Sequence, residues 1–163
     1  MPVDARHVAV VGHSIGGAAA VELLGRDARV DAAVDLDGDF FTEPPAAGLD
    51  RPVLLLGEQR TADPLTWAAA WERLRGWKRW LDVDGAGHLS FTDVHWYVDA
   101  LGTRDQVPPE ESGPVFGTMK GARADTVTRA YVGAFLDRQL RGVPSTLLDG
   151  PCPAFPEVAF LRR

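Results

Sequence analysis

The feature that most constrains this chain is the stretch GHSIGG at residues 12–17. An apolar, β-branched run, His7–Val11, precedes it, and a run of small, helix-prone residues follows it. This order predicts a strand, a sharp turn and a helix, which is the setting of a nucleophile elbow. A serine on so tight a turn has a strained backbone, so the residues two positions before and after it should lack a Cβ. Gly12 and Gly16 meet that condition, and the pattern predicts that the Ser14 hydroxyl points into open space.

Length and composition favour one domain that spans residues 1–163. The chain has 163 residues, of which 45% are hydrophobic, enough for a sizeable core. The net charge of −6 argues against a nucleic-acid partner. No apolar run approaches the roughly 18 residues of a membrane span, so we expect none. We also find no signal peptide, and the chain as read predicts a cytoplasmic protein.

Apolar runs alternate with helical patterns along the chain. The expected strands are His7–Val11, Val30–Leu36, Pro52–Leu56 and Lys78–Val83. The expected helices follow the first strand and then cover Leu65–Arg75, Phe91–Leu101 and Ala122–Arg141. Such alternation predicts an α/β fold with a parallel sheet flanked by helices. The segment 102–121 is rich in Pro and Gly, so we expect a surface loop there, and the tail that follows residue 142 should pack back without a long helix.

Three of the expected strands end in residues that could carry chemistry. Ser14 follows the first strand, Asp37 the second and His88 the fourth. Because catalytic groups lie beyond the carboxyl ends of parallel strands, these side chains should meet. A serine hydroxyl needs an imidazole to take its proton, and the imidazole needs a carboxylate to fix its tautomer. The order Ser, Asp, His is that of the α/β-hydrolase triad.

The sequence offers more than one candidate for the acid of this set. Asp37 ends the strand after the elbow, whereas Glu58 and Asp63 follow the next strand and stay open as alternatives. The base is better defined, because His88 stands in a glycine-flanked loop after a strand.

Further residues are candidates for the surroundings of the site. The backbone N–H of Ile15, at the start of the expected helix, should face a developing oxyanion. His13, inside the elbow, is expected to pack beside the site or to line the substrate cleft. Phe40 and Phe41 follow the candidate acid and Phe91 follows the base, so they are candidates for a substrate pocket, with core packing as the alternative.

Three motifs in combination resemble the plasma-type (isoform II) platelet-activating factor acetylhydrolases and their bacterial lipase relatives. They are GHSIGG at 12–17, Leu36-Asp37, and GAGHLSFTD at 85–93. The resemblance implies an α/β-hydrolase fold in which Ser14 is the nucleophile, Asp37 the orienting acid and His88 the general base. It further implies a serine ester hydrolase that cleaves short-chain or lipid acyl esters through an acyl-serine intermediate, without metal or other cofactor.

The resemblance covers the C-terminal half of that family. Its chains begin with several strands and a helix before the elbow strand, and here six residues precede His7. The absent part would hold the second oxyanion donor and the strands beside His7–Val11. We therefore expect a partial domain that forms a homodimer or pairs with a missing N-terminal half. The alternative function is that of a truncated, inactive hydrolase half that serves as a binding or assembly partner.

A second resemblance points to a different reaction. DLDGD at 35–39 is similar to the Asp-x-Asp-Gly-Thr signature of the haloacid-dehalogenase-type phosphatases, in which Asp35 would be the nucleophile, Asp37 the acid/base and Mg²⁺ the charge clamp. Asp39 departs from that signature, and the chain's two lysines, Lys78 and Lys120, are poorly placed for it. This interpretation is the less favoured one.

Metal dependence separates the two interpretations. We expect hydrolysis of p-nitrophenyl acetate to proceed at an unchanged rate when EDTA replaces MgCl₂, because a Ser-His-Asp mechanism needs no metal. The matched measurement uses p-nitrophenyl phosphate in both buffers. Phosphate release that requires Mg²⁺ would favour the phosphatase interpretation.

Overall fold

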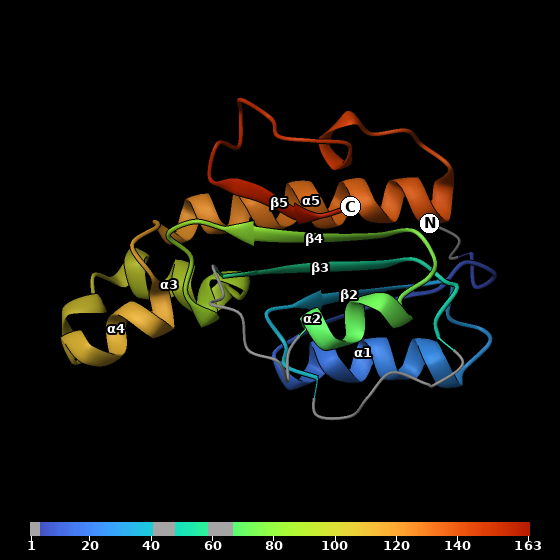
Figure 1. Ribbon diagram of the computed structural model, residues 1–163. Helices are drawn as coiled ribbons and strands as arrows, with labels where there is room; N and C mark the ends of the chain where they lie inside the picture. Colours follow the sequence, from blue (N-terminus) through green and yellow to red (C-terminus); the bar gives the residue numbers. More distant parts are fainter. Residues whose placement is uncertain (1–3, 41–47, 59–66) are drawn as a thin grey trace.

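The computed structural model describes residues 4–40, 48–58 and 67–163, which form a five-stranded sheet with helices on both faces (Figure 1). The strands are β1 (Ala9–His13), β2 (Ala32–Leu36), β3 (Val53–Glu58), β4 (Lys78–Val83) and β5 (Val158–Arg162). The α-helices are α1 (Ile15–Arg26), α2 (Trp67–Ala70), α3 (Asp93–Leu101), α4 (Pro109–Phe116) and α5 (Gly121–Arg141). Short 3₁₀ turns are η1 (Trp71–Arg73), η2 (His88–Phe91), η3 (Arg104–Gln106) and η4 (Thr146–Leu148).

The sheet is mixed, with the strand order β1-β2-β3-β4-β5. The first four strands pair in parallel, and β5 runs antiparallel to β4. The four strands expected from the sequence are thus parallel, as predicted, and β5 is an additional antiparallel strand. The tail pairs with the outer edge of β4 and so satisfies backbone groups that would otherwise be exposed. Although four of its five residues are apolar, this strand was not predicted, because three prolines stand shortly before it.

Two core clusters lie on opposite faces of the sheet. On one face, Leu54 and Leu56 of β3 pack against a cluster that includes Tyr131 and Phe135 of α5. On the other face, Leu55 packs into a cluster with residues of α1 and α2. In Figure 1, α1 and α2 accordingly cover the face opposite to α5. Burial on both faces explains why residues 53–56 of β3 are continuously apolar rather than alternating.

The structure corrects the prediction for the segment 102–121, which contains η3 and α4 rather than only a loop. Pro109 occupies the first helical position, where its missing N–H costs nothing and its fixed φ favours the helix. Glu110 and Glu111 place negative charge in the first turn, which stabilises the helix dipole. Pro109 is thus the first residue of a helix, although the prolines of this segment were taken as evidence against one.

Other elements differ from the predictions at their boundaries. The first strand is shifted, since β1 covers Ala9–His13. The helix expected at Leu65–Arg75 is a short α2 followed by the 3₁₀ turn η1, and its first two residues lie outside the described ranges. The helix expected from Phe91 begins at Asp93, because η2 takes up the residues before it.

No helix within the described ranges combines the length and the apolar character that crossing a membrane requires.

Strand β1 is hydrogen-bonded to β2 along one edge, and no described strand pairs with its other edge. Val8 and Val11, at 36% and 42% exposure, lie on or beside this open strand. An open apolar edge of this kind is a template for pairing with another chain.

We predict that residues 1–163, expressed alone, self-associate through the edge of β1. Val11→Lys should shift the population toward monomer, because a lysine on an edge strand opposes strand pairing. The measurement is sedimentation velocity over a concentration series. Leu161→Lys, which places the same charge on the opposite edge strand β5, is the matched control. A wild-type chain that stays monomeric at all concentrations would contradict the prediction.

Candidate active site

Ser14 lies on the turn between β1 and α1 in a strained backbone conformation, with φ 57° and ψ −131°. Gly12 and Gly17 make this turn possible. A Cβ on Gly12 would overlap the backbone of Gly16, and one on Gly17 would overlap the Asp35 carboxylate. A Cβ on Gly16 would meet nothing within 4 Å, so the predicted steric need for glycine holds at residue 12 and not at residue 16.

His88 begins the turn η2, after β4, and its two ring nitrogens face two different side chains. Nδ1 lies 2.6 Å from Asp37 Oδ2, and Nε2 lies 3.0 Å from Ser14 Oγ. Because a carboxylate can only accept, the Nδ1 proton is donated to Asp37. The Nε2 lone pair then faces Ser14, whose hydroxyl donates to it. The structure therefore brings these three side chains into one hydrogen-bonded line.

Asp37 follows β2 and is buried, with 1% of its surface exposed. Its φ of 56° is unusual for a residue with a side chain. The backbone N–H of Glu58 donates to its Oδ1 over 3.0 Å, and the other oxygen faces His88. Glu58, an alternative acid in the sequence, thus contributes a backbone N–H to Asp37. The other alternative, Asp63, lies outside the described residues.

Asp35 holds the turn that carries Asp37. It is wholly buried, Gly38 N–H donates to its Oδ1 at 2.8 Å, and Trp67 Nε1 donates to its Oδ2 at 3.1 Å. Trp67 Nε1 also lies 2.7 Å from the carbonyl of Gly38. A phosphatase nucleophile must be reachable by substrate, so this burial argues against that role for Asp35. In the described part of the chain, no cluster of three or more His, Cys, Asp or Glu side chains is arranged to hold a metal ion.

Sequence reasoning missed this supporting role of Asp35 and Trp67. The signal was available in part, because Asp35 lies inside an apolar run that was expected to be a buried strand. A carboxylate at such a position has to find buried hydrogen-bond donors. The donor on Trp67 could not be located, since it lies 32 positions away on another element.

His13 contacts His88 from the side of the elbow. Its Nε2 lies 2.7 Å from the His88 carbonyl and donates to it, and the two ring centroids are 4.6 Å apart. Burial lowers the pKa of His13, which favours the neutral ring. His13 is thus packed against His88, the first of the two placements considered for it.

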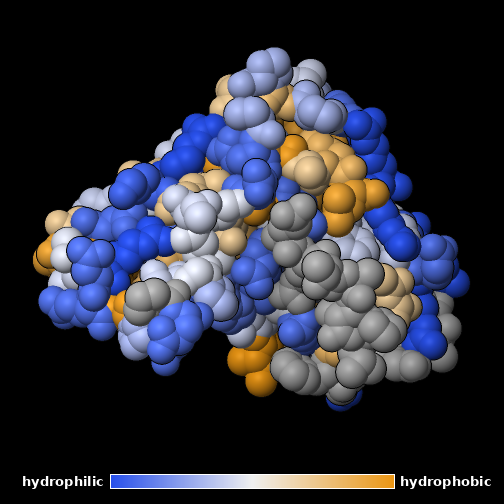
Figure 2. All heavy atoms as spheres, turned by 60° about the vertical axis from the view of Figure 1, so that its left-hand side comes forward, coloured by the Kyte–Doolittle hydropathy of each residue, from blue (hydrophilic) through white to orange (hydrophobic). Residues whose placement is uncertain are grey.

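The remaining candidates are Ile15 and the three phenylalanines, and those in the described ranges differ in how far they are buried. Ile15 is 70% exposed and its N–H is the first amide of α1. Phe40 packs against the core cluster on the α1 side, and Phe91 is buried in the cluster on the α5 side. Phe41 lies outside the described residues. Figure 2 shows that hydrophilic surface dominates the face on the α3 and α4 side, with separate hydrophobic patches between.

No family model matches the chain, but other known proteins do, and two of them are esterases. The first is a "probable 1-alkyl-2-acetylglycerophosphocholine esterase" of Arthroderma benhamiae (strain ATCC MYA-4681 / CBS 112371), 29% identical over 166 residues that cover 94% of this chain and 43% of that protein. The second is the solved structure of a ferulic acid esterase from Streptomyces cinnamoneus, 58% identical, which matches 98% of this chain and 48% of its own with a TM-score of 0.93.

These comparisons confirm the resemblance to platelet-activating factor acetylhydrolase-like esterases and the α/β-hydrolase type of fold. The structural match extends over nearly the whole chain at high identity, so it covers the elbow, the sheet and the helices together. The chain spans a little under half the length of both proteins it matches.

We predict that Trp67→Phe destabilises the turn that carries Asp37. The change removes the indole N–H from Asp35 and Gly38 and leaves a buried carboxylate with one donor fewer, at a cost of about 1–3 kcal/mol in the free energy of unfolding. Urea unfolding followed by circular dichroism measures this cost. Trp71→Phe, in the same apolar cluster, is the matched control for the loss of ring volume. Equal losses in the two variants would contradict the role given to the indole N–H.

Proposed function

We propose that this chain carries the catalytic triad of a serine ester hydrolase, with Ser14 as nucleophile, His88 as general base and Asp37 as the orienting acid. One observation carries the proposal. His88 lies between the other two side chains, 3.0 Å from Ser14 Oγ through Nε2 and 2.6 Å from Asp37 Oδ2 through Nδ1. This is the geometry in which a serine hydroxyl can pass its proton to a neutral imidazole.

The first half of the reaction forms an acyl-enzyme. Ser14 Oγ attacks the ester carbonyl carbon while its proton moves to His88 Nε2, and the carbonyl oxygen becomes an oxyanion. The N–H of Ile15 at the N-terminus of α1 stabilises that oxyanion. As the carbon–oxygen ester bond breaks, the imidazolium returns the proton to the departing alcohol and the acyl group stays on Ser14.

The second half releases the acid. Water gives a proton to His88 Nε2 as it attacks the acyl carbon, and the bond to Ser14 Oγ then breaks as the proton returns to that oxygen. The Asp37 carboxylate stabilises the imidazolium in both halves. Its other oxygen is held by the Glu58 N–H, so the carboxylate is oriented before substrate arrives.

The substrate class proposed is a carboxylic ester with a short-chain or lipid acyl group. Support comes from the names of the two relatives, one a phospholipid acetyl-ester esterase and the other an esterase of ferulic acid. These acyl groups differ in size, so the shared feature is the ester carbonyl rather than the acyl chain. The exposed side chain of Ile15, next to Ser14, offers an apolar surface beside the reacting carbon.

The rate depends on the number of oxyanion donors. Removal of one such donor from a hydrolase typically costs about 10²–10³-fold in turnover. Ile15 supplies one N–H, and a second donor in hydrolases of this type comes from a loop outside the elbow. We therefore expect turnover to depend on whether a second donor joins the Ile15 N–H at the oxyanion.

The triad assignment predicts graded effects of substitution. Ser14→Ala and His88→Ala should abolish hydrolysis of p-nitrophenyl esters, tested over a series of acyl lengths. Asp37→Asn should lower turnover by about 10³–10⁴-fold, because His88 then takes the wrong tautomer. His7→Ala, at an exposed histidine, is the matched control and should keep the wild-type rate.

Two results would contradict the assignment. Full activity in Asp37→Asn together with loss in Glu58→Gln or Asp63→Asn would place the acid elsewhere. A wild-type chain whose Ser14 does not react with a fluorophosphonate probe would be an inert half that serves as a binding partner.

A further inference from the structure

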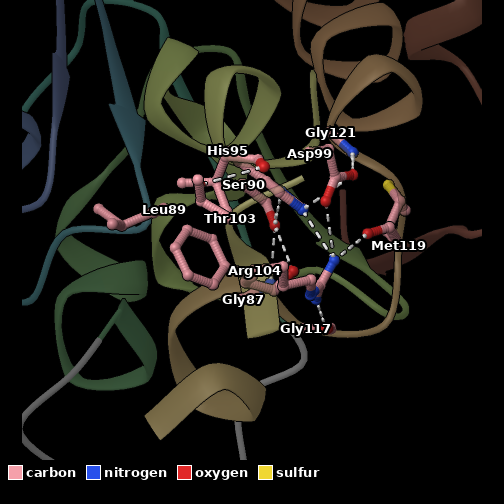
Figure 3. A network of polar contacts seen from close by, with 12 residues as sticks. Gly87, Leu89, Ser90, His95, Asp99, Thr103, Arg104, Gly117, Met119 and Gly121 are labelled. Carbon is pink, nitrogen blue, oxygen red and sulfur yellow. Dashed lines mark hydrogen bonds and ion pairs between the residues drawn. The ribbon is translucent and has the colours of Figure 1, made fainter. Parts of the chain in front are cut away.

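A second buried histidine, His95 on α3, lies beneath the loop that carries His88. It has no exposed surface, and the proposed reaction does not use it. Figure 3 shows it at the centre of a polar network with Ser90, Asp99 and Arg104. A buried imidazole is costly unless its nitrogens are hydrogen-bonded, so its partners indicate what it holds.

The proton positions in this network can be worked out from Ser90, whose hydroxyl has one proton. Gly87 N–H donates to Ser90 Oγ over 2.9 Å, and Ser90 donates its own proton to the carbonyl of Phe116 over 3.2 Å. His95 Nδ1, 3.1 Å from Ser90 Oγ, must then be the donor in that contact. The lone pair of His95 Nε2 is left to face the Arg104 guanidinium at 3.4 Å.

Arg104 and Asp99 extend the network to the connection between α4 and α5. Arg104 donates to the carbonyls of Gly117 and Met119 and lies 3.4 Å from Asp99. Asp99 accepts the N–H of Gly121 over 2.7 Å. The ring of His95 is therefore held between the α4–α5 connection and the loop of His88, and its burial lowers its pKa and keeps it neutral.

Ser90 and Gly87 flank His88 in the chain, so they fix its backbone from both sides. The Gly87 backbone also lies against Gly117 so closely that a Cβ on Gly87 would overlap it. On the opposite side, His13 donates to the His88 carbonyl. The reacting ring thus projects from a loop whose backbone is held by buried groups on α3 and by the elbow.

We propose that Ser90 and His95 are positioning residues for the candidate general base: the chain Gly87 N–H, Ser90 Oγ, His95 Nδ1 sets the place of His88 between Ser14 and Asp37. This inference rests on the proposed function. Displacement of a catalytic group by about 1 Å can cost about 10²-fold in rate. Loss of the Ser90 hydroxyl frees Gly87 N–H and His95 Nδ1 at once, so it should displace the loop.

The test compares Ser90→Ala and His95→Phe with Thr92→Val. The control removes a hydroxyl from the same segment, one that bonds to Leu89 within it and not to α3 or α4. We expect Ser90→Ala and His95→Phe to lower kcat about tenfold to hundredfold with KM within about twofold, and Thr92→Val to keep both within about twofold. His95→Asn should recover most of the rate, because its amide N–H stands as many bonds from Cα as Nδ1.

A readout that needs no turnover is the downfield NMR signal of the His88 Nδ1 proton bonded to Asp37. It should shift or broaden in Ser90→Ala and stay unchanged in Thr92→Val. Where His95→Phe does not fold, Ser90→Ala, which removes one atom, decides alone. A folded Ser90→Ala variant with wild-type kcat and signal overturns the proposal, as does an equal kcat loss in Thr92→Val.

The two proposals fail in different ways. A wild-type chain that neither hydrolyses esters nor reacts with a fluorophosphonate probe refutes the proposed function. The NMR signal in that same chain still decides positioning: a signal that Ser90→Ala leaves unchanged refutes it, and a signal that Ser90→Ala moves supports it.

Discussion

The left-handed backbone at Ser14 and Asp37 is the constraint on which the whole site depends. Among the described residues, these are the non-glycine positions with positive φ, and such strain typically costs about 1–3 kcal/mol at each. The surrounding sheet holds both turns in place. Ser14 N–H donates to the carbonyl of Leu36 over 2.9 Å, and Asp37 N–H donates to that of Leu56 over 3.0 Å. Each strained residue is thus held by a backbone hydrogen bond to the neighbouring parallel strand.

Parallel pairing explains why residues far apart in the chain meet at one edge. The strands β1, β2 and β4 all end at the same side of the sheet, and Ser14, Asp37 and His88 each follow one of them. The buried Asp35 carboxylate then stabilises the acid turn through Gly38 and Trp67. A loss of packing under that turn would therefore displace Asp37 without any change in the side chains of Ser14, Asp37 and His88.

The sequence was sufficient to predict those elements whose formation depends on one physical rule. Largely apolar runs predicted β2 and β3, because strands buried on both faces need no polar alternation. The glycines around Ser14 predicted the elbow. Helix α4 was missed because its prolines were taken as helix breakers, and strand β5 was missed because its formation depends on pairing with β4. The network around His95 was hidden because its members are spread from Gly87 to Gly121 and meet only when α3 packs under the loop.

Two further histidines, His13 and His95, lie near His88 in surroundings that favour the neutral ring. Burial lowers the pKa of His13 and of His95, and each donates a ring proton to a fixed acceptor, so both stay neutral at neutral pH. A neutral ring beside His88 does not repel the imidazolium that the reaction requires there. Asp37, fully buried and 2.6 Å from His88 Nδ1, is the charge that faces that cation. In the proposed reaction, His88 is therefore the histidine that takes up the proton, with two neutral rings near it.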